Sequence, residues 1–196
     1  MPTANRTRLG PLDCIVVDGG PSPRIAVVIC HGYGASYDDL APLSGEWISM
    51  LGDHAGDFRF VFPDAPHSLA ELGMPQGRAW WPIDMMRLAE ALQASRFDEL
   101  FDQEPPGIAE VRDMLCQTVA QVQVELGTDD GPLPLVMGGF SQGAMLALDT
   151  SLRGDVPCPD ALLQFSGTLI CRPEWRDALS RLTDTPVFQS HGMVDP

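Results

Sequence analysis

Six short apolar runs recur along the chain, and each has the length of one β-strand. Residues 25–30 (IAVVIC) form the clearest of them, a continuous β-branched run typical of a strand buried on both faces. Glycine, proline and aspartate stand beside most of these runs and mark turns. We predict strands over residues 12–17, 25–30, 58–62, 133–137, 161–165 and 187–190.

Apolar positions spaced three and four residues apart predict helices between the runs. The clearest helix covers residues 108–126, with Pro105-Pro106 before it and Gly127 after it. Its apolar face comprises Ile108, Val111, Leu115, Val119, Val122 and Leu126. Further helices are expected over residues 38–51, 142–152 and about 174–181. Strands that alternate with helices indicate an α/β fold, with a mostly parallel central sheet and helices on both faces.

The length of 196 residues fits a single domain over 1–196. The segment from about residue 65 to residue 101 adds length that a single crossover connection between two strands does not need. This stretch could form a lid or one wall of a substrate site, or it could be a surface excursion without function.

The charge balance limits the kinds of partner that the protein can bind. Twelve basic against 27 acidic residues give a net charge of −15, which argues against binding to nucleic acid phosphates. All twelve basic residues are arginine, so a catalytic Ser–Lys dyad and a Schiff-base lysine are excluded for these residues.

The cysteines and the lengths of the apolar runs indicate the cellular compartment. Five widely spaced cysteines without a C-x-x-C motif indicate reduced thiols of a cytoplasmic protein, and neither a disulfide framework nor a metal site is expected. The N-terminus has no apolar signal region, and no apolar run has the length of a membrane span.

The motif Gly139-Phe140-Ser141-Gln142-Gly143 carries the strongest chemical signal. It is a G-x-S-x-G sequence between a predicted buried strand and a predicted helix. In this position the serine sits on a tight turn with its hydroxyl exposed, and the small flanking residues let strand and helix approach. We predict that Ser141 is a nucleophile and that the N–H of Gln142 is one oxyanion donor.

A second oxyanion donor should come from the loop after an earlier strand. His31-Gly32-Tyr33-Gly34 follows the strand predicted over residues 25–30, and its glycines can expose backbone N–H groups. The N–H of Tyr33 is the best candidate. We expect His31 to shape this loop through hydrogen bonds and not to act as the base.

The acid of a Ser–Asp–His triad is expected at Asp195, just after the last predicted strand. A hydrolase of this type has its triad in the order Ser, Asp, His, and no histidine follows Asp195 in these 196 residues. His191 precedes the acid and belongs to its turn, while His54 and His67 are expected at the surface. We therefore predict that the general base is absent from this chain.

Together these motifs resemble the phospholipase/carboxylesterase family of the α/β-hydrolase superfamily, which includes acyl-protein thioesterases and small bacterial serine esterases. The matching pieces occur in the family's order between residues 27 and 195: Cys30–Gly34, Phe62–Pro66, Ala79–Asp84, Gly138–Gly143, Phe165–Leu169 and His191–Asp195.

The resemblance implies the roles of further residues. Ser141 and Asp195 match the nucleophile and the acid, Tyr33 and Gln142 the oxyanion positions, and His31, Gly32, Trp81 and Gly167 the substrate pocket. It implies a small acyl ester or thioester substrate, hydrolysed through an acyl-enzyme, and no metal or organic cofactor.

Family members continue with a final strand, a His-bearing loop and a closing helix, and we expect all three to be missing here. An open sheet edge would make a homodimer plausible. The alternative is an inactive α/β-hydrolase-like binding protein that has lost its histidine.

Overall fold

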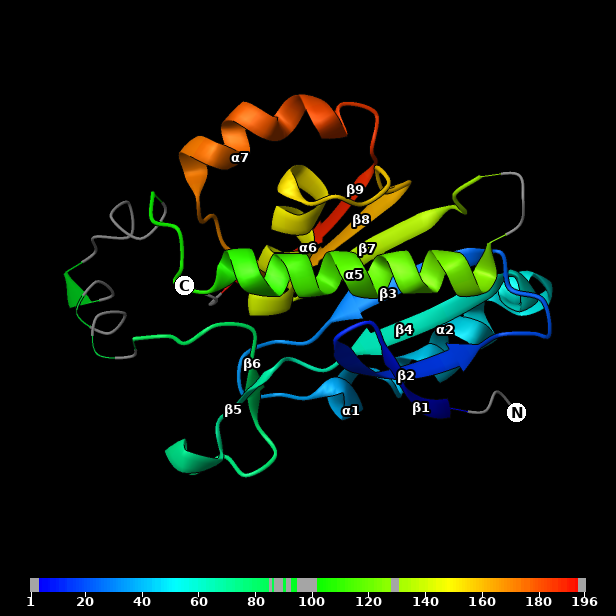
Figure 1. The fold of residues 1–196 in the computed structure, drawn as a ribbon, viewed down its shortest axis with the longest axis horizontal. Coiled ribbons are helices and arrows are strands. Elements are labelled where there is room, and N and C mark those ends of the chain that lie inside the picture. Colours follow the sequence, from blue (N-terminus) through cyan, green and yellow to red (C-terminus); the bar gives the residue numbers. More distant parts are fainter. Residues whose placement is uncertain are drawn as a thin grey trace.

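A seven-stranded sheet runs through the molecule and carries helices on both faces (Figure 1). The computed structural model describes residues 4–84, 86, 90, 93–94, 102–127 and 131–193. The strand order is β1-β2-β4-β3-β7-β8-β9, in which β2 runs antiparallel to both of its neighbours, β1 and β4, and the pairs from β4 to β9 are all parallel. The strands are β1 (Ala4–Leu9), β2 (Leu12–Asp18), β3 (Ile25–Cys30), β4 (Phe58–Pro63), β7 (Leu135–Phe140), β8 (Ala161–Phe165) and β9 (Val187–Ser190).

Each face of the sheet has its own apolar core. Helices α5 (Ile108–Leu126), α6 (Gln142–Arg153) and α7 (Arg172–Ala178) cover one face. The short helices α1 (Tyr37–Leu40) and α2 (Leu43–Leu51) cover β2, β4 and β3 on the other (Figure 1). Alternate residues of the buried strands therefore serve different cores, as the period of two in a strand requires.

Short 3₁₀ segments and a small hairpin complete the described elements. The 3₁₀ segments are η1 (Gly52–Asp57), η2 (Ala70–Leu72) and η3 (Leu179–Leu182). The hairpin pairs β5 (His67–Ser68) with β6 (Arg78–Ala79). No helix within the described ranges is both long and apolar enough to cross a membrane.

The six predicted strands all occur, and two details of the prediction are wrong. The predicted helix over residues 38–51 is two helices, because Pro42 lacks the N–H that a continuous helix needs there. The strand β1 was not predicted, because five of its six residues are exposed and its sequence is mostly polar.

The segment predicted as a lid or wall is only partly described. Residues 65–84 carry the β5–β6 hairpin, whereas residues 85, 87–89, 91–92 and 95–101 lie outside the described residues. A lid role for residues 65–101 stays a prediction.

The last described strand is an exposed edge. All four residues of β9 are exposed, and Val187 and Phe188 each have more than half of their surface in solvent (54% and 58%). Phe188 contacts Phe165 of β8, with ring centroids 5.9 Å apart.

Candidate active site

Ser141 occupies a strained turn between β7 and α6. Its backbone has φ 52° and ψ −117°, a conformation that side chains beyond glycine rarely adopt. The turn is held by the Ser141 N–H, which donates to the Phe165 carbonyl oxygen at 2.8 Å. A serine at this position of a strand-to-helix turn has the geometry of a nucleophile elbow.

The two glycines of the motif allow backbones to approach closely around Ser141. A Cβ atom at Gly143 would lie 2.2 Å from the Cys30 carbonyl oxygen and 2.4 Å from that of His31. A Cβ atom at Gly139 would lie 2.6 Å from the Cys30 oxygen. Both glycines are therefore required for α6 to start directly against the end of β3.

Replacing Gly143 with alanine is expected to destabilise the protein, because the new methyl group would overlap two backbone carbonyls that cannot rotate away. Overpacking of this kind costs about 1–3 kcal/mol of unfolding free energy. Urea denaturation measures it. Gly45→Ala in α2 is the matched control, because nothing lies within 4 Å of its Cβ position, and it should gain about 0.5–1 kcal/mol. Equal stability of the two variants would contradict the close approach at Gly143.

The predicted oxyanion donors belong to two segments that meet at Ser141. Gln142 is the first residue of α6, so its N–H has no acceptor within the helix. Tyr33 lies in a turn closed by the Ala35 N–H, which donates to the Gly32 oxygen at 3.3 Å, with Gly34 at φ +81°. Such a turn uses the N–H of its last residue and not that of Tyr33.

The Gly32 backbone lies close to Ser141. A Cβ atom at Gly32 would lie 3.4 Å from the Ser141 Cβ and 3.0 Å from the Phe140 Cδ1. The turn that carries Tyr33 and the helix that carries Gln142 therefore both begin next to Ser141.

His31 is buried, with 1% of its surface exposed, and its ring holds the loop. Nδ1 lies 2.8 Å from the Gly32 oxygen, and Nε2 accepts from the Ala65 N–H at 3.0 Å. Because both ring nitrogens are engaged in loop contacts, the structure does not offer this imidazole to Ser141. The other three histidines, His54, His67 and His191, are exposed.

The predicted acid, Asp195, lies outside the described residues, and its role stays a prediction. The strand that precedes it is placed, since Ser190 of β9 is in register with Phe165 of β8, which is in register with Phe140. The end of β9 is therefore at the same edge of the sheet as Ser141, two strands away.

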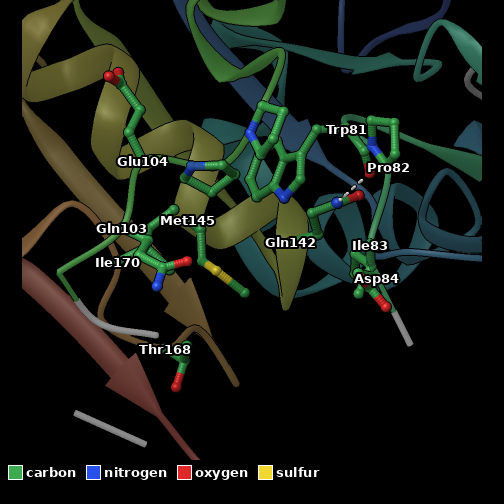
Figure 2. A pocket seen from close by; sticks show the side chains of 12 residues that line it. Trp81, Pro82, Ile83, Asp84, Gln103, Glu104, Gln142, Met145, Thr168 and Ile170 are labelled. Atoms are coloured by element: carbon green, nitrogen blue, oxygen red, sulfur yellow. Dashed lines mark hydrogen bonds between the residues drawn. The ribbon is translucent and has the colours of Figure 1, made fainter. Parts of the chain in front are cut away.

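An apolar cavity of about 240 Å³ opens beside the start of α6 (Figure 2). Trp81, Met145 and Ile170 contribute much of its apolar wall, and Gln142 reaches into its lining. The remaining described lining residues are Pro82, Ile83, Asp84, Gln103, Glu104, Pro105, Pro106 and Thr168.

Only part of the predicted substrate pocket lines this cavity. Trp81 does, while His31, Gly32 and Gly167 are not among its described lining residues, so their pocket role stays a prediction. Met145 was not predicted, although a signal existed. It follows Ser141 by four residues, which is about one helical turn.

The five cysteines are all free, and four of them are buried. Burial raises the pKa of Cys14 to about 12, and it also raises the pKa values of Cys30, Cys116 and Cys171. These four thiols are neutral at physiological pH and are poor nucleophiles. None of these four buried cysteines therefore offers a thiolate nucleophile.

Comparison with known proteins identifies the family. The profile of the Phospholipase/Carboxylesterase family matches residues 13–196. The chain belongs to this family. This membership, together with the relatives below, makes it a hydrolase of the carboxylic ester class and confirms the resemblance drawn from the motifs.

Sequence relatives of this Phospholipase/Carboxylesterase chain include fungal thioesterases. It is 27% identical over 190 residues to the acyl-protein thioesterase 1 of Candida albicans, covering 90% of this chain and 73% of the relative. It is 25% identical over 193 residues to the acyl-protein thioesterase 1 of Kluyveromyces lactis, covering 95% and 76%.

Solved structures confirm the α/β-hydrolase fold. Esterase PE8 superposes with a TM-score of 0.64 at 23% identity, covering 91% of this chain and 88% of that one. The acyl-protein thioesterase 2 of Zea mays gives a TM-score of 0.55 at 20% identity, covering 93% and 78%. The predicted loss of a last strand, His loop and closing helix is untested by these likenesses.

Proposed function

We propose that this protein is a serine carboxylesterase or thioesterase that hydrolyses small acyl esters or thioesters through an acyl-enzyme. The observation that carries the proposal is the strained Ser141 at the β7–α6 turn, with the Gly32–Ala35 turn against it and an apolar cavity lined by the next residue, Gln142. A serine with neighbouring backbone donors and an apolar recess is the arrangement that acyl transfer needs.

In the proposed reaction, the Ser141 hydroxyl attacks the acyl carbonyl carbon. The oxyanion of the tetrahedral intermediate accepts hydrogen bonds from the N–H groups of Tyr33 and Gln142. The positive end of the α6 dipole stabilises the same charge. The alcohol or thiol then leaves, and water releases the acyl group from Ser141.

The proton of the Ser141 hydroxyl must pass to a histidine of a Ser–Asp–His triad. Of this triad, only the serine and the aspartate are assigned here. We propose Asp195 as the residue that orients a histidine and stabilises its charged form. None of the four histidines in these 196 residues is proposed as that base. His31 is held within its loop, and the other three do not follow Asp195 in the sequence.

The acyl group is proposed to enter the apolar cavity. The indole of Trp81 and the thioether side chain of Met145 offer apolar contacts at the start of α6. The names of the fungal relatives support an S-acyl substrate as one possibility, and that of esterase PE8 an oxygen ester.

The proposal also includes a cytoplasmic location and a homodimer. Buried neutral thiols support a reducing compartment such as the cytoplasm. The exposed edge of β9 supports pairing with a second copy, which sedimentation velocity with and without Phe188→Asp would test.

A series of p-nitrophenyl esters from acetyl to octanoyl, with matched S-acyl thioesters, tests this function. We expect one range of chain lengths to be preferred, and Trp81→Ala to change that range more than it changes the best rate. An unaltered chain-length profile in Trp81→Ala would contradict the pocket role. Because none of the four histidines in these 196 residues is proposed as the base, the assay uses a form of the protein that supplies the triad histidine. No turnover of any substrate by that folded form would contradict the enzymatic proposal and favour a non-catalytic binding protein.

A further inference from the structure

The side chain of Gln142 is bonded to a segment sixty residues away in the chain. The amide is buried, with 1% exposure, and its Oε1 accepts from the Trp80 N–H at 2.9 Å. Its Nε2 donates to the Trp81 oxygen at 2.9 Å, a bond drawn in Figure 2. The Gln142 side chain therefore holds the main chain of Trp80 and Trp81 with two hydrogen bonds, one that it accepts and one that it donates.

The Trp80 side chain in turn forms a hydrogen bond to the loop that follows β3. Trp80 is fully buried, and its Nε1–H donates to the His31 oxygen at 2.8 Å. The His31 carbonyl directly precedes Gly32 and Tyr33. One tryptophan thus connects the Gln142 amide to the loop that holds the second oxyanion donor.

Two backbone bonds and an ion pair bind the same segment to the loop. The Gly34 N–H donates to the Arg78 oxygen at 2.8 Å, and the Arg78 N–H donates to the Ala35 oxygen at 2.9 Å. The Arg78 Nε pairs with Asp64 Oδ2 at 2.7 Å, and Asp64 Oδ1 accepts from the N–H of Tyr37, just beyond the loop, at 3.2 Å. Residues 78–81 therefore form a brace between the turn of residues 32–35 and the start of α6.

We propose that Gln142 and Trp80 are positioning residues, and that their side chains hold the Tyr33 and Gln142 N–H groups at a fixed separation around the oxyanion. This inference rests on the proposed function. Donors that stabilise a transition state must be fixed to within about 0.5 Å, and loops without support do not meet this tolerance. The two donors belong to separate elements, and the brace joins those elements through buried, paired groups.

The test uses Trp80→Phe, which keeps a buried aromatic ring and removes the indole N–H that reaches His31. The matched control is Trp175→Phe in α7, where the buried indole N–H donates to Asp149 Oδ1 at 2.7 Å. Both variants lose one buried indole hydrogen bond, so a general loss of stability affects both.

The readout compares p-nitrophenyl butyrate with its thiono analogue, which replaces C=O by C=S and keeps the leaving group. Sulfur is a weak hydrogen-bond acceptor, so the rate ratio of the two substrates reports on the oxyanion donors. Removing a whole donor lowers kcat by about 10²–10³. For Trp80→Phe we expect a fall of roughly tenfold in kcat on the oxygen ester, with KM within about twofold, and a similar fall in the rate ratio.

A second measurement does not depend on turnover. Amide hydrogen exchange over residues 31–35 should accelerate in Trp80→Phe and stay unchanged in Trp175→Phe. An unchanged rate ratio and unchanged exchange in Trp80→Phe would overturn the positioning role. The kinetic comparison uses a form of the protein that supplies the triad histidine. If that folded form shows no Ser141-dependent turnover, the proposed function fails, and the exchange measurement still decides whether Trp80 holds the loop.

Discussion

In a form of the protein that supplies the triad histidine, Ser141→Ala is expected to reduce ester hydrolysis to the rate measured in buffer. The serine oxygen is the atom that becomes acylated in the proposed reaction, and no neighbouring thiol can replace it, because the four buried cysteines are neutral. Loss of the nucleophile in a comparable triad lowers kcat on the order of 10⁶-fold. Steady-state release of p-nitrophenol measures the effect.

The stability of this variant needs its own control, because Ser141 is strained. A residue at positive φ stores about 1–3 kcal/mol, and alanine at this position keeps that strain. Ser141→Gly relieves the strain and removes the same hydroxyl. Both variants should be inactive, and glycine should be the more stable. Turnover by either variant above the buffer rate would contradict the assignment of Ser141.

Asp149→Ala is expected to cause the largest loss of stability among the charged residues considered. Asp149 is fully buried in α6, and its carboxylate contacts Arg112 at 2.9 Å, Arg153 at 2.7 Å and the indole of Trp175 at 2.7 Å. Both guanidinium groups are mostly buried, with 16% of each side chain exposed. Removing one member of a buried ion pair costs about 3–5 kcal/mol, because the partner charges remain buried.

This network joins α5, α6 and α7, the three helices that cover one face of the sheet. Urea denaturation of Asp149→Ala measures its contribution. Asp177→Ala is the control, since its pair with Arg176 is 3.8 Å long and exposed on both sides, and its denaturation midpoint should not move. Similar midpoints for Asp149→Ala and wild type would contradict the network.

Apolar strands could be predicted from the sequence, whereas the mostly polar strand β1 could not. Residues 25–30 and 161–165 are visible as strands because burial requires apolar side chains there. The strand β1 is held by pairing with β2, so its own side chains carry no pattern. The split of residues 38–51 was visible in the sequence as Pro42, and the prediction gave it too little weight.

Within the site, the sequence predicted the local features and missed those formed by distant contacts. The strained turn at Ser141 and the need for Gly143 follow from one short motif, and so does the proposed role of Ser141. The bonds of the Gln142 side chain do not, because they join residue 142 to residues 80 and 81 through the fold. Trp80 and Trp81 are adjacent in sequence, yet one braces the loop and the other lines the cavity.

The central claim is that Ser141 carries the acyl group, and trapping that intermediate tests it most directly. The form of the protein that supplies the triad histidine is mixed with p-nitrophenyl butyrate, quenched in acid within the first turnovers, digested and analysed by mass spectrometry. The account predicts a butyryl mass increment on Ser141 alone, absent from Ser141→Ala. A butyryl group on another residue that forms at the same rate in Ser141→Ala would contradict it.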